Sequence, residues 1–244
     1  MKPSSNVEPD IDQIDPPYSP VLLLVMLLVS AGGAALAILV LPRWVPGMSA
    51  SLEGEQPKVF WYLSRASGFM AYLLLWASLM LGVGVTNKSA SLWPGIPSAL
   101  ELHQYFSFLG VFFTLFHALI LAGDAYLKPT LMQIFSPFSM SNYRSVAVGL
   151  GQMGFYLWIL ILLSFYIRKW ISNKGWRFFH YFGYLLFAFA LIHGLLAGTD
   201  AGTEWARILY WGTSVLLLGM TIYRIVNARA RAREKKPLQA SPRI

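Results

Sequence analysis

The sequence predicts an all-α fold: a polytopic membrane bundle of six transmembrane helices. Of the 244 residues, 56% are hydrophobic and only 12% are charged, and a soluble domain of this size could not bury so much apolar surface. Six apolar segments, each near the roughly 20 residues needed to cross a bilayer, are separated by shorter polar stretches. The chain contains no cysteine, which excludes disulfides, thiolate metal sites and cysteine nucleophiles.

The expected spans follow one another along most of the chain. They cover residues 21–41, 59–85, 100–123, 146–167, 178–198 and 205–226. Pro42 ends the first span, and tryptophan and tyrosine residues gather near the span ends, as interfacial anchors do. Residues 1–20 are acidic and rich in proline, without the positive start of a signal peptide, and are expected to form a disordered cytoplasmic tail.

The distribution of lysine and arginine predicts the orientation. The connection between the fourth and fifth spans carries Arg168, Lys169, Lys174 and Arg177 without an acidic residue, and residues 227–244 form a basic tail. The positive-inside rule therefore places both termini in the cytoplasm of a multi-pass protein of the cell membrane. The net charge of +8 is explained by topology and contact with membrane lipid, so nucleic acid is not an expected partner.

All four histidines of the chain lie in the third and fifth spans. His103 and His117 are 14 positions apart, and His180 and His193 are 13 apart. At about 1.5 Å per residue, His103 and His117 are roughly 21 Å apart along a helix, so one metal ion cannot bind both. Because the two spans run in the same direction, we expect His103 to pair with His180 near the inner face and His117 with His193 nearer the outer face.

Each expected pair offers two imidazoles and little else. A structural zinc ion takes four ligands, but no cysteine is present, and Glu101 lies two positions from His103 and would point away from it. A metal that needs only two protein ligands brings its own equatorial plane, as haem iron does. Since the sequence has no Cys-x-x-Cys-His motif, the haem would be of the b type. The sequence therefore predicts a di-haem core with four histidine ligands. We expect two b-type haems, and no fewer than one.

Two details leave alternatives open. Gly110 lies seven residues from both His103 and His117, where it either gives room to a macrocycle or allows close helix packing. On an ideal helix, the 13-residue step turns His193 away from the face of His180, so tilt, a local bulge or different ring orientations must absorb the difference.

These histidine pairs resemble those of the ferric-reductase-like transmembrane family, which includes NADPH oxidases and eukaryotic ferric reductases. The pairs are separated by 13 and 12 intervening residues, which matches the family's spacing on its third and fifth helices. Other stretches resemble the bacterial branch of the family: residues 64–68, 124–126, 137–144, 176–180 and 193–200. The resemblance implies a haem-binding transmembrane domain over residues 59–226, preceded by the separate helix of residues 21–41.

The resemblance also implies a function: electron transfer across the membrane through two b haems, from a cytoplasmic or membrane donor to an acceptor at the outer face. No flavin or nicotinamide motif occurs in this sequence, so we expect an oxidoreductase component that takes electrons from a separate donor protein or a quinone. The haem-binding membrane subunit of periplasmic methionine sulfoxide reductase is similar in this respect, and a periplasmic protein is one expected acceptor. The alternatives are a non-redox haem-binding protein and a structural bundle without a cofactor.

Three arginines are candidates for holding the haem carboxylates. Arg65 lies in the outer third of the second span, where the family places an arginine near the outer haem; the alternative is snorkelling to the interface. Arg177, three residues before His180, either binds the inner haem or serves only as a topology charge. Arg144 at the outer rim is a further candidate.

Overall fold

The computed structural model describes residues 18–56, 58–87, 89 and 95–234. The first 17 residues of the expected N-terminal tail and residues 235–244 of the expected basic tail lie outside the described residues. Over the part of the chain that is described, every regular element is a helix and no strand occurs, so the predicted all-α fold is confirmed there.

The described part of the chain forms helices of very different lengths, from single 3-10 turns to helices of more than 20 residues. They are α1 (Pro20–Leu39), the 3-10 helix η2 (Leu41–Arg43), α2 (Pro46–Glu53), α3 (Val59–Asn87), α4 (Ile96–Ile120), the 3-10 helix η4 (Leu121–Gly123), α5 (Leu131–Phe135), α6 (Ser145–Tyr166), α7 (Arg168–His180), α8 (Phe182–Ala197) and α9 (Glu204–Glu234).

Six helical segments are long and apolar enough to cross a membrane, as predicted. They cover Pro20–Arg43, Val59–Asn87, Ile96–Gly123, Ser145–Tyr166, Trp170–Ala197 and Glu204–Ala230. Their outward faces carry large apolar side chains in contact with the surroundings; Leu28 on α1 is 62% exposed and Ile208 on α9 is 73% exposed. Such continuous apolar exposure is unusual for a soluble protein and suits a lipid environment. The chain is therefore a multi-pass membrane protein.

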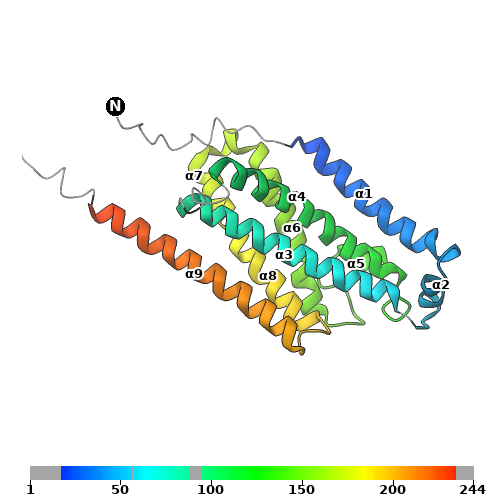
Figure 1. The fold of residues 1–244 in the computed structure, drawn as a ribbon. Helices are drawn as coiled ribbons and strands as arrows, with labels where there is room; N and C mark the ends of the chain where they lie inside the picture. The colour runs from blue at the N-terminus through cyan, green and yellow to red at the C-terminus, as the bar shows by residue number, and fades with distance from the viewer. Residues whose placement is uncertain (1–17, 57, 88, 90–94, 235–244) are drawn as a thin grey trace, which may run out of the picture.

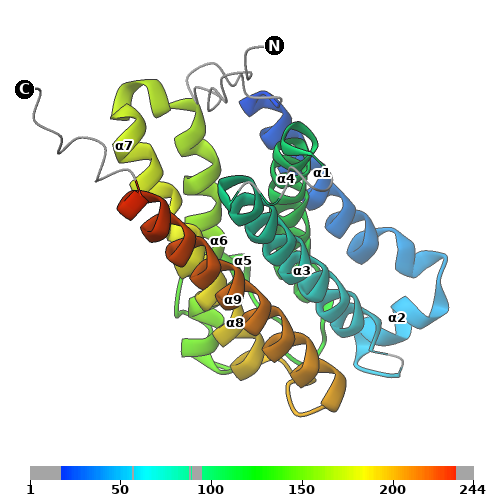
Figure 2. The ribbon, with the colours of Figure 1, turned by 60° about the vertical axis from the view of Figure 1, so that its left-hand side comes forward.

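The long helices form one bundle, with α1 and α9 on opposite outer sides of it (Figures 1 and 2). We call the end where α4 and α8 begin the basic end, because α7, which carries Arg168 and Arg177, lies there (Figure 2). The other end, which we call the loop end, carries α2, α5 and the connection between α8 and α9 (Figure 2). His103 near the start of α4 and His180 just before α8 thus lie toward the basic end, and His117 and His193 toward the loop end.

The centre of the bundle is packed by apolar and aromatic side chains from six helices, α1, α3, α4, α6, α8 and α9. Tyr72, Phe108, Trp158 and Leu186 are all at most 6% exposed. The indole of Trp158 fills the space beside Gly110, where any side chain would overlap it. The structure thus favours the close-packing interpretation of Gly110 over room for a macrocycle.

Two helix boundaries differ from those expected. The basic connection before the fifth span is itself helical, as α7, and it is interrupted only by Ser172, whose φ of 61° is not helical. Helix α9 continues past the expected end at Val226 to Glu234, through a stretch of alternating alanine and arginine. Alanine and arginine favour helices, so the helix persists beyond the apolar segment.

Candidate functional site

The structure brings the four histidines together in two pairs, each drawn from two helices. The ring centroids of His103 on α4 and His180 on α7 are 5.8 Å apart, with an interplanar angle of 68°. Those of His117 on α4 and His193 on α8 are 6.0 Å apart, at 85°. Two imidazoles bound to one metal from opposite sides, with metal–nitrogen bonds of about 2 Å, place their centroids about 6 Å apart. The expected pairing of the side chains is confirmed, and the spacing fits one metal between each pair.

Helix α3 holds the two histidines of α4 in the same way. Nδ1 of His103 lies 2.7 Å from the backbone oxygen of Ser78, and Nδ1 of His117 lies 2.6 Å from that of Ser64. A carbonyl oxygen can only accept, so Nδ1 carries the proton in each ring and the Nε2 lone pair is free. This is the tautomer in which a histidine binds a metal through Nε2, with Nδ1 fixed by an outer partner.

The serine hydroxyls strengthen both contacts. The hydroxyl of Ser78 lies 3.0 Å from Nδ1 of His103 and donates to the backbone oxygen of His103 at 3.1 Å. The hydroxyl of Ser64 lies 3.1 Å from Nδ1 of His117 and donates to the backbone oxygen of His117 at 3.0 Å. Each serine thereby fixes both the ring and the backbone of its histidine.

One turn after each serine, a glycine makes room for the ring. A Cβ at Gly68 would lie 2.8 Å from Nδ1 of His117, and one at Gly82 would lie 3.3 Å from Cε1 of His103. Helix α3 thus repeats a Ser-x-x-x-Gly unit at an interval of 14 residues, equal to the interval between the histidines of α4. This repeat was not foreseen from the sequence, although the recurrence of the unit at the histidine spacing is visible there.

Helix α6 holds His193 by a similar arrangement. Nδ1 of His193 donates to the backbone oxygen of Ala147 at 2.9 Å. One turn later on the same helix, a Cβ at Gly151 would lie 2.7 Å from this Nδ1. Both rings of the loop-end pair are therefore oriented by a carbonyl acceptor and seated against a glycine.

His180 is placed differently. It is the last residue of α7, and its ring stacks on Trp176 with centroids 5.0 Å apart and an interplanar angle of 24°. Nδ1 of His180 and Nε1 of Trp176 are both buried without a hydrogen-bond partner. This ring is held by stacking instead of an oriented hydrogen bond.

The junction between α7 and α8 explains how the 13-residue spacing is accommodated. The helix is interrupted at Tyr181, whose backbone N–H is shared between the oxygens of Arg177 at 3.3 Å and Phe178 at 3.2 Å. The N–H of Tyr184 bonds the oxygen of Tyr181 at 3.1 Å. These three-residue bonds are those of a 3-10 turn, which advances about 20° further per residue than an α-helix. A local tightening therefore supplies part of the rotation that brings His180 and His193 to the same side.

A cavity surrounds the loop-end pair. Its volume is about 210 Å³. This is far more than the roughly 10–15 Å³ that a single water molecule needs. Its wall includes both histidines together with Gly68, Gly151 and Trp158, and it is mainly apolar and aromatic. A flat apolar group of considerable size fits such a space.

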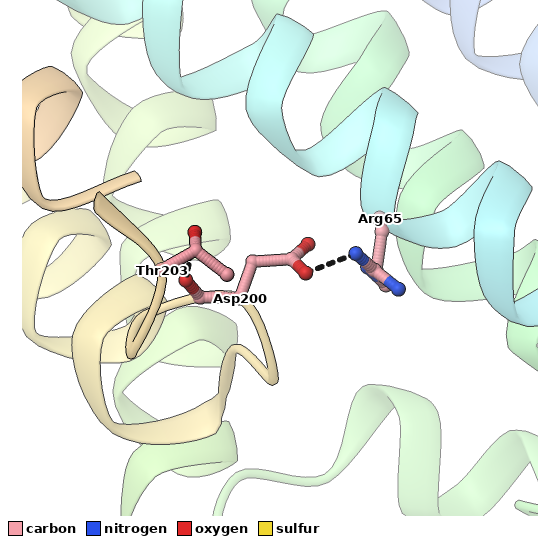
Figure 3. A network of polar contacts seen from close by, with 3 residues as sticks. All are labelled: Arg65, Asp200 and Thr203. Carbon is pink, nitrogen blue, oxygen red and sulfur yellow. Dashed lines mark hydrogen bonds and ion pairs between the residues drawn. The ribbon is translucent and has the colours of Figure 1, made fainter. Parts of the chain in front are cut away.

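Arg65 and Asp200 form an ion pair at the wall of this cavity. Figure 3 shows Arg65 extending from α3 toward Asp200 in the α8–α9 connection. The two side chains are 31% and 14% exposed, and Nε of Arg65 is buried without a partner. The acidic partner was not foreseen from the sequence.

The other two candidate arginines are exposed. Arg144 is exposed and donates to the backbone oxygen of Leu196 at the end of α8. Arg177 on α7 is exposed, near the basic end. A role of either arginine toward a cofactor stays a prediction.

The donor set suits a metal that brings ligands of its own. Within the described residues, no group of three or more histidine, aspartate or glutamate side chains is arranged to hold a metal ion. Each pair offers two imidazole rings with centroids 5.8 and 6.0 Å apart. The residues present therefore fit a haem with two axial histidines, by ring spacing at both sites, by tautomer at three of the rings and by cavity at the loop end.

Comparison with protein-family models, curated proteins and solved structures finds no match to this chain.

Proposed function

We propose that the protein binds two b-type haems, one between His103 and His180 and one between His117 and His193, and transfers electrons across the membrane. The observation that carries this proposal is the geometry of the pairs. Two half-buried imidazole pairs with centroids 5.8 and 6.0 Å apart lie within apolar helical segments, with three of the four Nδ1 atoms engaged by backbone carbonyls. Ionisable groups at such depth are rare and usually functional.

In this proposal the four Nε2 atoms would hold the two haem irons. When bound, haem supplies an iron centre that cycles between its ferric and ferrous states. Ser64, Ser78 and Ala147 keep three of the rings in the ligating tautomer, while Arg65 and Arg177 are assigned to the haem carboxylates. The 14-residue step along α4 separates the two sites by roughly 21 Å, so together they reach across most of the apolar thickness.

We further propose that the basic end faces the cytoplasm of the cell membrane, by the positive-inside rule. Electrons then enter from a separate donor protein or a quinone and leave to an acceptor at the loop end, such as a periplasmic protein. The histidine spacing and the stretches around residues 64–68 and 193–200 support placing the protein beside ferric-reductase-like transmembrane proteins.

The function is tested in sealed vesicles that contain the purified, haem-loaded chain. A membrane-impermeant reductant, dithionite, is added outside, and ferricyanide trapped inside is followed by its absorbance. We expect reduction of the trapped ferricyanide that depends on the protein and is abolished by His117→Ala. Vesicles with fully haem-loaded protein and no reduction beyond that of empty vesicles would instead support a haem-binding protein without a redox role.

A further inference from the structure

We propose that His180 is the exchangeable ligand of the basic-end pair, and that a small neutral π-acceptor molecule such as carbon monoxide takes its place on the reduced protein. This inference rests on the proposed function, since it assumes a haem between His103 and His180. It distinguishes the two sites: one is open to an added ligand and the other is closed.

One of the four rings lacks a hydrogen bond from Nδ1 to an outer partner. His103, His117 and His193 each donate from Nδ1 to a backbone oxygen, at 2.7, 2.6 and 2.9 Å. Nδ1 of His180 is buried with no hydrogen-bond partner. Loss of such an outer partner typically weakens metal binding by about 10–100-fold. Of the four rings, His180 is therefore the one whose bond to a metal is not strengthened by an outer hydrogen bond.

The backbone at His180 is also less constrained than at the other ligands. His193 lies within α8, five residues before the C-cap Gly198, and its ring is pressed against the backbone of α6 at Gly151. His180 ends α7, next to the interruption at Tyr181, and α7 itself contains the non-helical Ser172. A ring at a helix junction can turn away without breaking a continuous ladder of hydrogen bonds.

The surroundings of His180 allow this movement. On one side its ring meets the side chain of Trp176 instead of a helix backbone. Phe178 and Tyr181, beside it in sequence, are 69% and 48% exposed. By contrast, His103 on the opposite side of the same pair is fixed by Ser78 and seated against Gly82.

The site lies between two candidate membrane spans, Ile96–Gly123 and Trp170–Ala197, so charged ligands are excluded by the cost of burying their charge. A neutral diatomic molecule that binds ferrous haem carries no charge to bury and is small enough to take the place of one imidazole. Carbon monoxide is the probe because it binds only when a coordination position opens.

The test mixes dithionite-reduced, haem-loaded protein with carbon monoxide and follows the Soret band in time. We expect about one carbon monoxide per chain, bound at a rate limited by departure of His180. His180→Ala should accelerate this binding at least about tenfold while keeping its stoichiometry, because the position is already open. Ser67→Ala on α3, whose hydroxyl bonds only carbonyls of its own helix, is the control and should leave the rate of this binding unchanged.

Each other outcome overturns the inference. Wild-type protein with two haems and no carbon monoxide binding would show that both pairs are firmly closed. An unchanged rate in His180→Ala would show that departure of His180 does not control the binding, and complete loss of the basic-end haem in His180→Ala would make His180 a principal ligand. A chain that binds no haem at all would overturn the proposed function itself, and with it this inference.

Discussion

Gly151 offers a sharp test of the loop-end site, because a single methyl group there would meet the ring of His193. A Cβ at Gly151 lies 2.7 Å from Nδ1 of His193, whereas ordinary contact begins near 3.4 Å, so in Gly151→Ala the ring must retreat by about 0.7 Å. Its hydrogen bond to the backbone oxygen of Ala147, now 2.9 Å, would then exceed the length of a hydrogen bond. We expect the loop-end haem to bind about 10–100-fold more weakly, or about 1.4–2.8 kcal/mol.

The matched control is Gly154→Ala on the same helix. Its Cβ would meet only ordinary contacts, the nearest being Cδ1 of Leu186 at 3.5 Å. Alanine is favoured over glycine in helices by about 1 kcal/mol, so neither change should weaken α6 by itself.

The assay follows transfer of haem from each detergent-purified variant to excess apomyoglobin. Gly151→Ala should release one of two haems about 10–100-fold faster than the parent, and Gly154→Ala should match the parent. Equal release rates from Gly151→Ala and Gly154→Ala would refute the idea that the glycine seats a ligand ring.

The remaining predictions concern the supporting contacts. Ser78→Ala removes a hydroxyl but leaves the carbonyl acceptor, so we expect a modest loss of about 1 kcal/mol in basic-end haem affinity. The control is Ser67→Ala, whose hydroxyl bonds only carbonyls of its own helix; an equal loss there, by haem titration, would contradict the role of Ser78. Asp200→Asn breaks the ion pair with α3, yet because both partners are partly exposed the free energy of unfolding should change by only about 1 kcal/mol or less; a larger shift in thermal unfolding would show that the pair is a structural lock. Gly110→Ala forces a methyl group into the indole beside it and should lower the thermal stability by about 1–3 kcal/mol, whereas Gly212→Ala on α9, with open space around it, should not; equal melting temperatures would contradict the packing assignment.

The sequence predicted the spans and the partner of each histidine well, because both depend on simple periodicities. Apolar length marks a membrane helix with little interference from tertiary contacts. The interval of 14 residues between His103 and His117 excludes a shared metal on the helical rise alone, and the direction of the spans then fixes the pairing.

The parts that the sequence did not predict depend on contacts between distant segments. The ion pair of Arg65 with Asp200 joins residues 135 positions apart, and no local pattern marks the acid as its partner. The seats for the rings are glycines and backbone oxygens, which carry no chemical signature of their own. Only the repeat of serine and glycine on α3 at the histidine interval held a readable signal. Helix α7 was not predicted because its basic and polar residues are typical of a loop between membrane spans, yet they form a helix that leads into the fifth span.

The most direct test of the central claim is a reduced-minus-oxidised optical spectrum of the purified full-length protein, with haem counted per chain, repeated on His103→Ala and His117→Ala. The account predicts two low-spin b haems per chain, with each variant losing chiefly one. Protein purified with no haem, under mild conditions and with haem supplied during expression, would contradict it.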